Sequence, residues 1–419
     1  MSKSFSKKGI IALCSLVYFV SYFSRKDFAA AMVGMISSSV LDKPSAGLMG
    51  TFMFIFYGIG QLLSGYLGDK FKPQYIILTG LSTTAVCNIL LPFIPAYAMV
   101  PIWGLNGLAQ AMLWPPIVKI LSEYLDHETY VKANFLVTSA AHVATILLYI
   151  FVPVCLNIWS WQTVFFTAGA LVVVSIAVFI LALALVLPRD VQKQLISANK
   201  SSGRTDNERS FSKVMIASGI IPILGAIIAS GFLRDGIESW LPTLYSEVFG
   251  RDASESVLVS VVLPIFSIAS IYTVTAFHKK KLFNNELRGA IILFIACIAL
   301  CVPLAVLINL KAMAARFICL ILVALVCAGM HGINFLLISC LPGRFSSLGR
   351  SSSVGGLVNA FVYVGAACSM YGIALISDNL GWLATAISWI IISAVGAVLS
   401  AVAYRKYTAF ISDPSQKTV

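Results

Sequence analysis

The sequence predicts an all-α membrane protein of twelve transmembrane helices, arranged as two pseudo-symmetric six-helix halves. Hydrophobic residues make up 59% of the 419 residues and charged residues only 11%, with a mean hydropathy of +0.92. This composition is typical of polytopic helical membrane proteins and excludes a soluble domain of this size. Twelve apolar stretches also reach the length of about 20 residues that crosses a hydrocarbon core of roughly 30 Å.

The expected helices cover, in order, residues 10–38, 46–68, 74–92, 97–122, 130–156, 162–187, 214–247, 254–277, 289–309, 313–341, 350–376 and 380–404. The distribution of Lys and Arg orients them, because inner loops of membrane proteins carry an excess of these residues. With both termini in the cytoplasm, 22 of the 29 fall in inner loops and tails. The outer side carries only Lys43, Arg251, Lys311 and Arg316. We therefore expect a multi-pass protein of the cell membrane with both termini cytoplasmic.

The net charge of +12 follows from this topology. A nucleic-acid-binding protein would gather its basic residues on one stripe, whereas here they are spread over the inner loops. The nine cysteines lie in apolar spans, without a Cys-x-x-Cys pair or a His/Cys cluster, so neither a disulfide framework nor a metal site is expected. The chain has no nucleotide-binding loop, and we expect neither an enzyme nor a protein that uses a cofactor.

The longest polar stretch, residues 188–213, is rich in Ser, Asn, Lys and Arg. We expect it to be a cytoplasmic linker between an N-terminal half (1–187) and a C-terminal half (214–419). The first helix of each half is long and carries an arginine, Arg25 or Arg234, just beyond its middle. An arginine at the bilayer centre costs roughly 3 kcal/mol on insertion scales. Two such residues at matching places therefore predict two fixed positive charges in one pore.

The loop expected between the second and third helices, residues 65–73, resembles the signature Gly-x-Leu-x-Asp-Arg/Lys-Phe-Gly-Arg of the major facilitator superfamily. Gly65 lets two helices approach closely, and Asp69 and Lys70 supply an acid–base pair that can latch the cytoplasmic helix ends in one state. The resemblance implies that superfamily's fold, in which two six-helix halves form a site at their interface. The equivalent segment of the second half, residues 277–281, lacks the acid, so we expect a one-sided latch.

Tyr18, Tyr22 and Arg25 fall at i, i+4 and i+7, on one face of the first helix. Polar groups on such a face need partners, which predicts that the face lines a cavity rather than contacting lipid. In the second half, Arg234 and Glu238 are i, i+4 neighbours that can pair when no ligand is bound.

Two further candidates, His142 and His331, lie in apolar surroundings on the fifth and tenth expected helices. Each can be a pore residue or a packing residue, and an intramembrane arginine can likewise serve only to bridge helices. The pair of arginines favours an anion, because their planar forks suit oxyanions. A phosphate monoester carries about −1.5 to −2 charges at pH 7. Charge and geometry therefore match a phosphorylated solute better than a monocarboxylate.

Residues 18–32, Tyr-Phe-Val-Ser-Tyr-Phe-Ser-Arg-Lys-Asp-Phe-Ala-Ala-Ala-Met, resemble helix 1 of the organophosphate:phosphate antiporters. That family includes the bacterial glycerol-3-phosphate and hexose-6-phosphate transporters. Further similar motifs are Tyr57-Gly58-Ile59, residues 107–116, Ala141-His142, Trp159-Ser160-Trp161, Leu233-Arg234, Trp240 with Pro242-Thr243, Gly332, Tyr363-Val364-Gly365 and Gly381-Trp382. The resemblance implies that Arg25 and Arg234 grip the phosphate. It also implies that other residues line the path or contact the substrate: Lys26, His142, Tyr18, Tyr22, Tyr57 and Tyr363. Trp240, Glu238, His331 and Gln61 complete the expected substrate-binding set.

This chain departs from the family at four positions: Gln61, Gly231, Phe266 and His331 stand where the family usually has a lysine, a tyrosine, an acid and a tyrosine. The phosphate grip is kept, whereas the pocket for the organic part is altered. The identity of the organic phosphate therefore cannot be borrowed from the well-known members.

We expect a monomeric secondary transporter that exchanges an organic phosphate, of the sugar phosphate or glycerol phosphate class, for inorganic phosphate by alternating access. In the empty site the two arginines would have limited compensation, and a bound dianion would neutralise both. Two alternatives remain open. One is a membrane sensor of sugar phosphates, which the family also includes. The other is a proton-coupled transporter of another organic anion, with His142 or His331 titrating. The expected partners are these small anions and the lipid bilayer, with no nucleic acid.

Overall fold

The computed structural model describes residues 2–186, 215–280, 283, 285–310, 313–348 and 351–412. These residues form helices and turns, and no strand occurs among them. Eleven helical stretches of the described chain are long and apolar enough to cross a membrane. The predicted class, an all-α membrane protein, is confirmed. The linker expected at residues 188–213 lies outside the described residues.

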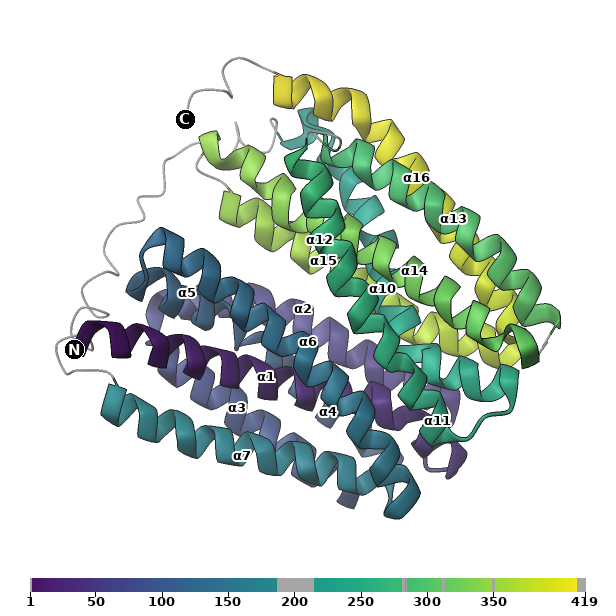
Figure 1. Ribbon diagram of the computed structural model, residues 1–419, viewed down its shortest axis with the longest axis horizontal. Coiled ribbons are helices and arrows are strands. Elements are labelled where there is room, and N and C mark those ends of the chain that lie inside the picture. Colours follow the sequence, from purple (N-terminus) through teal and green to yellow (C-terminus); the bar gives the residue numbers. More distant parts are fainter. Residues whose placement is uncertain are drawn as a thin grey trace. The chain divides into compact units, whose positions relative to one another are not determined.

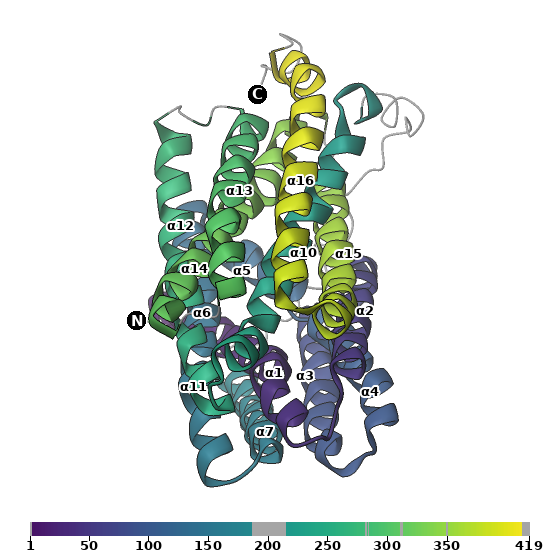
Figure 2. The same cartoon turned by 90° about the vertical axis from the view of Figure 1, so that its right-hand side faces the viewer.

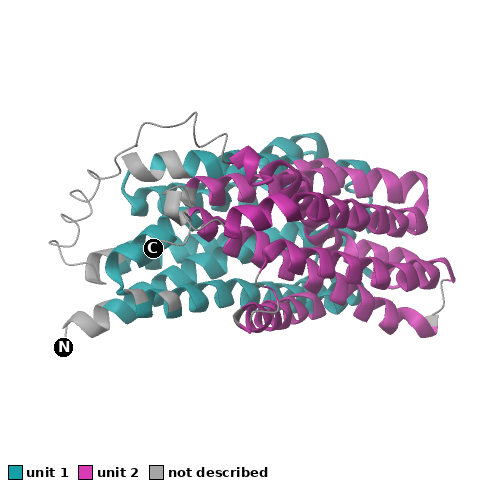
Figure 3. Cartoon of the chain, turned by 90° about the horizontal axis from the view of Figure 1, so that it is seen from above, with its two compact units in different colours: residues 1–45, 52–204, 253–261 teal, residues 46–51, 205–252, 262–419 magenta. Residues whose placement is uncertain are grey.

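The chain divides into two compact units (Figure 3). The first comprises residues 1–45, 52–204 and 253–261, and the second comprises residues 46–51, 205–252 and 262–419. In the first unit the described helices are α1 (Ser2–Ser37), α2 (Lys43–Lys70, except Ala46–Thr51), α3 (Pro73–Leu90), α4 (Ala96–Ala111), α5 (Trp114–Tyr124), α6 (His127–Ile158), α7 (Trp161–Val186) and α11 (Ala253–Leu258). A single 3-10 turn at Leu91–Phe93 follows α3.

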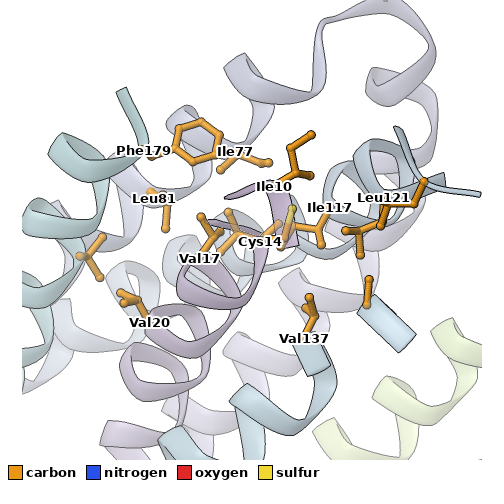
Figure 4. Packing of buried hydrophobic residues seen from close by; sticks show 14 of the residues in the cluster. Ile10, Cys14, Val17, Val20, Ile77, Leu81, Ile117, Leu121, Val137 and Phe179 are labelled. Carbon is orange, nitrogen blue, oxygen red and sulfur yellow. The ribbon is translucent and has the colours of Figure 1, made fainter. Parts of the chain in front are cut away.

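The core of the first unit lies where α1 packs along α6 and α7 and where α3 packs against α7. Ile10, Cys14 and Val17 recur at helical spacing on α1 and are buried there. They meet side chains of the neighbouring helices, among them Leu81 of α3 and Phe179 of α7 (Figure 4). This apolar stripe fixes the rotation of α1 about its own axis, and so determines where its polar residues lie.

The fourth expected span, residues 97–122, is broken in the middle, which is why it is not among the eleven continuous stretches. α4 ends at Ala111 and α5 begins at Trp114. Between them Met112 and Leu113 make short i→i−3 hydrogen bonds, to the carbonyl oxygens of Ala109 and Gln110. The two prolines that follow Trp114 have no N–H to continue the α-helical ladder, so the helix restarts one turn later.

In the second unit the described helices are α10 (Ile220–Phe249), α12 (Val262–Lys279), α13 (Glu286–Leu310), α14 (Arg316–Asn334), α15 (Ser351–Asn379) and α16 (Gly381–Ser412). α13 runs beside α16 (Figures 1 and 2). α10, which corresponds to the seventh expected helix, packs against α15, α16 and α14. It is the most buried of the membrane-crossing stretches that the structure describes, with 67% of its apolar window inside the protein.

Two glycines bring α10 and α15 into backbone contact. A Cβ on Gly231 would collide with the carbonyl oxygen of Val362, and a Cβ on Gly365 would collide with that of Ile228. No side chain fits at either position without moving a helix. This contact accounts for the glycine at position 231, because α15 leaves no room there for a side chain.

Two other expected helices are interrupted. The span expected at 254–277 begins as α11, passes through a 3-10 turn at Val259–Val261 and continues as α12. The span expected at 313–341 starts with a 3-10 turn at Met313–Ala315, before α14. After α14 the chain continues through a π-helical turn at Phe335–Cys340 and a 3-10 turn at Leu341–Leu348. Wider and tighter turns of this kind are common at functional sites and helix ends.

Candidate anion-binding site

Arg25 of the first unit lies against two aromatic rings. Its guanidinium carbon is 4.1 Å from the ring centroid of Tyr22, three residues earlier on α1, and 5.1 Å from that of Tyr57 on α2. Tyr57 is buried, whereas Arg25 and Tyr22 are half-buried. Such cation–π contacts stabilise a guanidinium away from bulk water by about 0.5–2 kcal/mol. The N–H donors of an arginine lie in the plane of its guanidinium group, the geometry in which an oxyanion is bound.

The aromatic contact continues along α1 toward the start of α5. The hydroxyl of Tyr18 donates to that of Tyr22 over 3.4 Å, and the Tyr18 ring lies 4.7 Å from the ring of Trp114. The prediction that Tyr18, Tyr22 and Arg25 share one face of the first helix is confirmed. Trp114 belongs to the motif at residues 107–116, but it was not predicted as a site residue.

A buried polar seam on another side of α1 was missed by the sequence analysis. Ser21 donates to the amide oxygen of Gln110 over 2.6 Å, and the Gln110 amide donates to the hydroxyl of Ser24 over 3.1 Å. The amide groups of Asn88 and Asn106 both approach the backbone carbonyl of Ser24, at 3.5 and 3.4 Å. These hydrogen bonds join α1 to α3 and α4, so they position the helix that carries Arg25.

Asp27 lies one turn further along this seam and is fully buried. Its Oδ1 accepts the backbone N–H of Phe28 over 2.7 Å, while its Oδ2 has no hydrogen-bond partner in the described structure. Phe28 contacts Trp103 of α4, with 5.6 Å between ring centroids, which places this level of α1 beside α4. The sequences of α3, α4 and α7 contain no Asp, Glu, Lys, Arg or His.

In the second unit, Arg234 forms an ion pair with the residue that follows it. Nη2 of Arg234 is 2.6 Å from Oδ2 of Asp235, and both side chains are largely buried. Glu238 contacts His331 of α14, with 2.7 Å between Nε2 and Oε1. Asp235 makes a close ion pair with Arg234 that was not predicted, and Glu238 also acts on Arg234 electrostatically. That Glu238 is the resting partner of Arg234 stays a prediction, whereas the expectation that Arg234 has limited compensation is wrong.

The remaining expected residues are half-buried or buried, and their roles stay predictions. His142 is half-buried on α6, where Nδ1 hydrogen-bonds the carbonyl of Thr138 over 3.0 Å. Gln61 donates to the carbonyl of Ala111 over 3.2 Å, at the end of α4. Trp240 is fully buried on α10, and its Nε1 has no hydrogen-bond partner among the described residues. Lys26 is half-buried beside Arg25.

The predicted latch residues lie on α2 rather than in a loop. Gly65, Asp69 and Lys70 fall in the last two turns of this helix, and their side chains lie outside what the structure describes. The segment 277–281 indeed lacks an acid, but Glu286, at the start of α13, supplies one. Glu286 is buried and accepts from Arg344 over 2.8 Å.

The Glu286 cluster ties together three elements of the second unit. The carboxylate also accepts the hydroxyl of Tyr407 on α16 over 2.9 Å, while Asn285 donates to Thr408 over 2.8 Å. The expectation of a latch in the first half alone overlooked this cluster, because its acid lies outside the segment that corresponds to the signature. Within the described residues, no group of His, Cys, Asp and Glu side chains is placed to hold a metal ion.

The sequence profile of the Major Facilitator Superfamily matches residues 14–341. A probable hexose phosphate transport protein of Chlamydia trachomatis is 30% identical over 162 residues, which cover 38% of this chain and 35% of the relative. The membrane sensor protein UhpC of Escherichia coli is 23% identical over 390 residues, or 90% of this chain and 87% of the relative. The glycerol-3-phosphate transporter of Bacillus subtilis is 24% identical over 256 residues, or 56% of each.

The matched stretch therefore spans about a third of the length of the chlamydial relative. Among solved structures, a bacterial homolog of the human lysosomal transporter Spinster, inward-facing and unoccupied, superposes with a TM-score of 0.75 at 13% identity, covering 98% of this chain and 99% of that one. This likeness concerns the fold. The names of the sequence relatives agree with the resemblance of residues 18–32 to the organophosphate:phosphate antiporters, which is confirmed.

Proposed function

Because this chain belongs to the Major Facilitator Superfamily, we propose that it is a secondary transporter that exchanges an organic phosphate for inorganic phosphate by alternating access. The organic phosphate is of the sugar phosphate or glycerol phosphate class. The names of two relatives support this class, since one is a probable hexose phosphate transport protein and the other is a glycerol-3-phosphate transporter.

The observation that carries the proposal is the pair of intramembrane arginines on the first helix of each half. Arg25 is held over the Tyr22 ring, and Arg234 is held by a carboxylate that a stronger anion can replace. Neither residue has an evident purpose in an ordinary apolar core, because burying an arginine is costly unless it is paired. Two guanidinium groups that bind one ligand require a dianion with several acceptor oxygens, which describes a phosphate monoester.

An anion that binds Arg234 must compete with Asp235, which already pairs with this arginine. A phosphate that takes over Arg234 leaves the Asp235 carboxylate to find other partners, and a ligand with two charges offsets this loss better than a ligand with one. Once bound, the dianion neutralises Arg25 and Arg234 together, and the occupied form changes state more readily than the empty form. Inorganic phosphate and a phosphate ester both meet this requirement, so exchange is the natural mode of transport.

The proposal is tested with the purified full-length protein in liposomes. Liposomes loaded with phosphate should take up radiolabelled glucose 6-phosphate, glycerol 3-phosphate or phosphate, whereas liposomes without internal phosphate should take up little. Uptake that requires a pH gradient instead of internal phosphate would contradict exchange and favour proton-coupled transport. A panel of labelled sugar and glycerol phosphates then names the preferred substrate.

A sensor is the second candidate, and one observation favours it. The relative that matches along most of both chains is named as a membrane sensor protein. A sensor would bind sugar phosphates without moving them across the membrane. Binding to the detergent-purified protein together with absent flux in liposomes would therefore favour the sensor over the exchanger.

The orientation belongs to the same proposal. Because most Lys and Arg residues fall in the expected inner loops, we place both termini in the cytoplasm of a cell-membrane protein, acting as a monomer. Reporter domains fused to either terminus should be active only if they function in the cytoplasm. A reporter that is active outside the cell would contradict this topology.

A further inference from the structure

A carboxylate and an imidazole meet inside the second unit, one helical turn from Arg234. Oε1 of Glu238 on α10 lies 2.7 Å from Nε2 of His331 on α14, and the side chains are 13% and 17% exposed. An ionised carboxylate only accepts hydrogen bonds, so Nε2 of His331 carries the proton and donates. The partial exposure shows that neither side chain is sealed inside the helix packing.

The ion pair of Arg234 with Asp235 means that a second carboxylate is not needed at this point as a counter-ion. Glu238 follows Arg234 by four residues, so it lies on the same helix face and about 6 Å further along the axis. A ligand whose phosphate binds Arg234 would therefore place its organic part near the pair of Glu238 and His331. All four residues belong to one unit.

The chemistry of the pair restricts what that organic part can be. A second phosphate or a carboxylate would be repelled by Glu238, and an alkyl chain would displace water from the polar pair without offering a hydrogen bond in return, which is costly. A hydroxyl group fits, because it donates to a carboxylate and accepts from an N–H.

We propose that Glu238 and His331 recognise hydroxyl groups of the organic part, and that this pair discriminates sugar and glycerol phosphates from alkyl or aryl phosphates. This inference rests on the proposed function, and it gives the departure at His331 a role. The competing interpretation is that the pair only fastens α10 to α14. A fastening role predicts a loss of stability with no change in ligand discrimination.

The experiment measures direct binding to the purified full-length protein, by calorimetry, of three probes: glucose 6-phosphate, hexyl phosphate and inorganic phosphate. Glu238→Gln and His331→Leu should each weaken glucose 6-phosphate by about tenfold or more, since hydrogen bonds to a charged group are lost. Affinity for hexyl phosphate and inorganic phosphate should not fall, and this also shows that the variants are folded. His331→Gln keeps an amide N–H directed at Glu238 and should retain part of the preference for glucose 6-phosphate.

Glu247→Gln is the matched control, because it makes the same change on the same helix. Glu247 accepts from Trp382 over 2.8 Å, nine residues beyond Glu238. This variant should bind all three probes as the wild type does. Equal weakening of all three probes by Glu238→Gln and His331→Leu would overturn the inference, and so would unchanged binding of glucose 6-phosphate.

The same measurements separate this inference from the exchange proposal. If the wild type discriminates glucose 6-phosphate from hexyl phosphate through the pair but shows no flux in liposomes, exchange is wrong and the recognition of hydroxyls stands. If the protein exchanges phosphate but the pair does not affect discrimination, exchange stands and this inference is wrong.

Discussion

Arg234 and Asp235 are consecutive residues of α10, yet their side chains meet at 2.6 Å inside the second unit. Successive side chains on a helix point in different directions and seldom form close pairs. Here the two largely buried groups bend toward each other, because a guanidinium at this depth needs a counter-ion. The carboxylate that neutralises Arg234 at rest therefore comes from its neighbour.

Replacing Asp235 by Asn tests this relationship. Without the carboxylate, Arg234 keeps a buried charge with weaker compensation, and the protein should lose about 3 kcal/mol of stability in phosphate-free buffer. Phosphate should bind more tightly than to the wild type, because it no longer competes with Asp235, and should restore much of the lost stability. Thermal unfolding with and without phosphate measures both effects, and Asp252→Asn, an exposed position, is the control. Equal stabilisation of wild type and Asp235→Asn by phosphate would show that Asp235 is not displaced.

Substitution of either arginine by lysine should cripple exchange. Arg25→Lys and Arg234→Lys keep the charge but lose the planar fork that holds an oxyanion at two points, so uptake should fall at least about tenfold. Insertion into the membrane should be unaffected. The exposed Arg405, which lies near the end of α16, supplies the control Arg405→Lys. Wild-type rates in both variants would refute the grip by two arginines.

Tyr22 should stabilise Arg25 through the face of its ring rather than through its hydroxyl. Arg25 lies 4.1 Å from the ring centroid, so Tyr22→Phe should keep phosphate affinity close to that of the wild type. Tyr22→Leu removes the π-face and should weaken binding several-fold, as expected for the loss of about 0.5–2 kcal/mol. Titration of phosphate against both variants makes the comparison. If Phe and Leu have the same effect, the hydroxyl and not the ring is what supports Arg25.

The fold could be predicted from the sequence because membrane-crossing length is a property of each stretch alone. The point at which a helix breaks was harder to predict. Pro115 and Pro116 are evident in the sequence, but the span 97–122 was expected to be continuous. The face shared by Tyr18 and Arg25 was predictable from helical periodicity.

Contacts between helices were not predictable in the same way. The approach of Asn88 and Asn106 to the backbone of Ser24 depends on which helices pack together, and apolar spans of similar length carry little information about this. The ion pair of Arg234 with Asp235 was not predicted, because the i, i+4 rule describes helix surfaces, whereas this buried arginine pairs with its direct neighbour.

An ion pair outside the membrane-spanning segments predicts that the folded protein loses stability in acid. Lys7 of α1 lies 2.6 Å from Asp126, which also caps α6 through Thr129. These hydrogen bonds, first that from Lys7, hold the pKa of the Asp126 carboxyl below its usual range. A depressed pKa stabilises the fold above the unfolded value of about 3.9, and the benefit is lost as the pH falls through the folded-state pKa.

Asp126→Asn isolates the charge, because asparagine is also a good helix cap. The variant should melt at a lower temperature than the wild type at pH 7, and the difference should shrink on acidification below about pH 4. Melting temperatures across this range measure it. A difference that does not depend on pH would assign the effect to capping geometry rather than to the ion pair.

Asp27 should tolerate loss of its charge. It is fully buried toward α3 and α4, whose sequences contain no charged side chain, and one of its oxygens has no partner among the described residues. An ionised carboxylate in such a place is very costly, so we expect the group to be the neutral acid. Asp27→Asn has nearly the same shape and no charge, and it should keep both stability and exchange. Asp27→Leu removes the polar atoms and should disturb the seam beside Ser24.

Uptake of phosphate and thermal unfolding of the two Asp27 variants provide the measurement. The outcome that would contradict a neutral structural acid is a stable Asp27→Asn protein that no longer exchanges, together with an active Asp27→Glu protein. That result would mean that Asp27 must release its proton during the cycle, and it would favour proton-coupled transport over simple exchange. Because Asp27 lies two residues from Arg25, on the helix that the seam positions, the test also shows whether the phosphate grip and proton movement are separable.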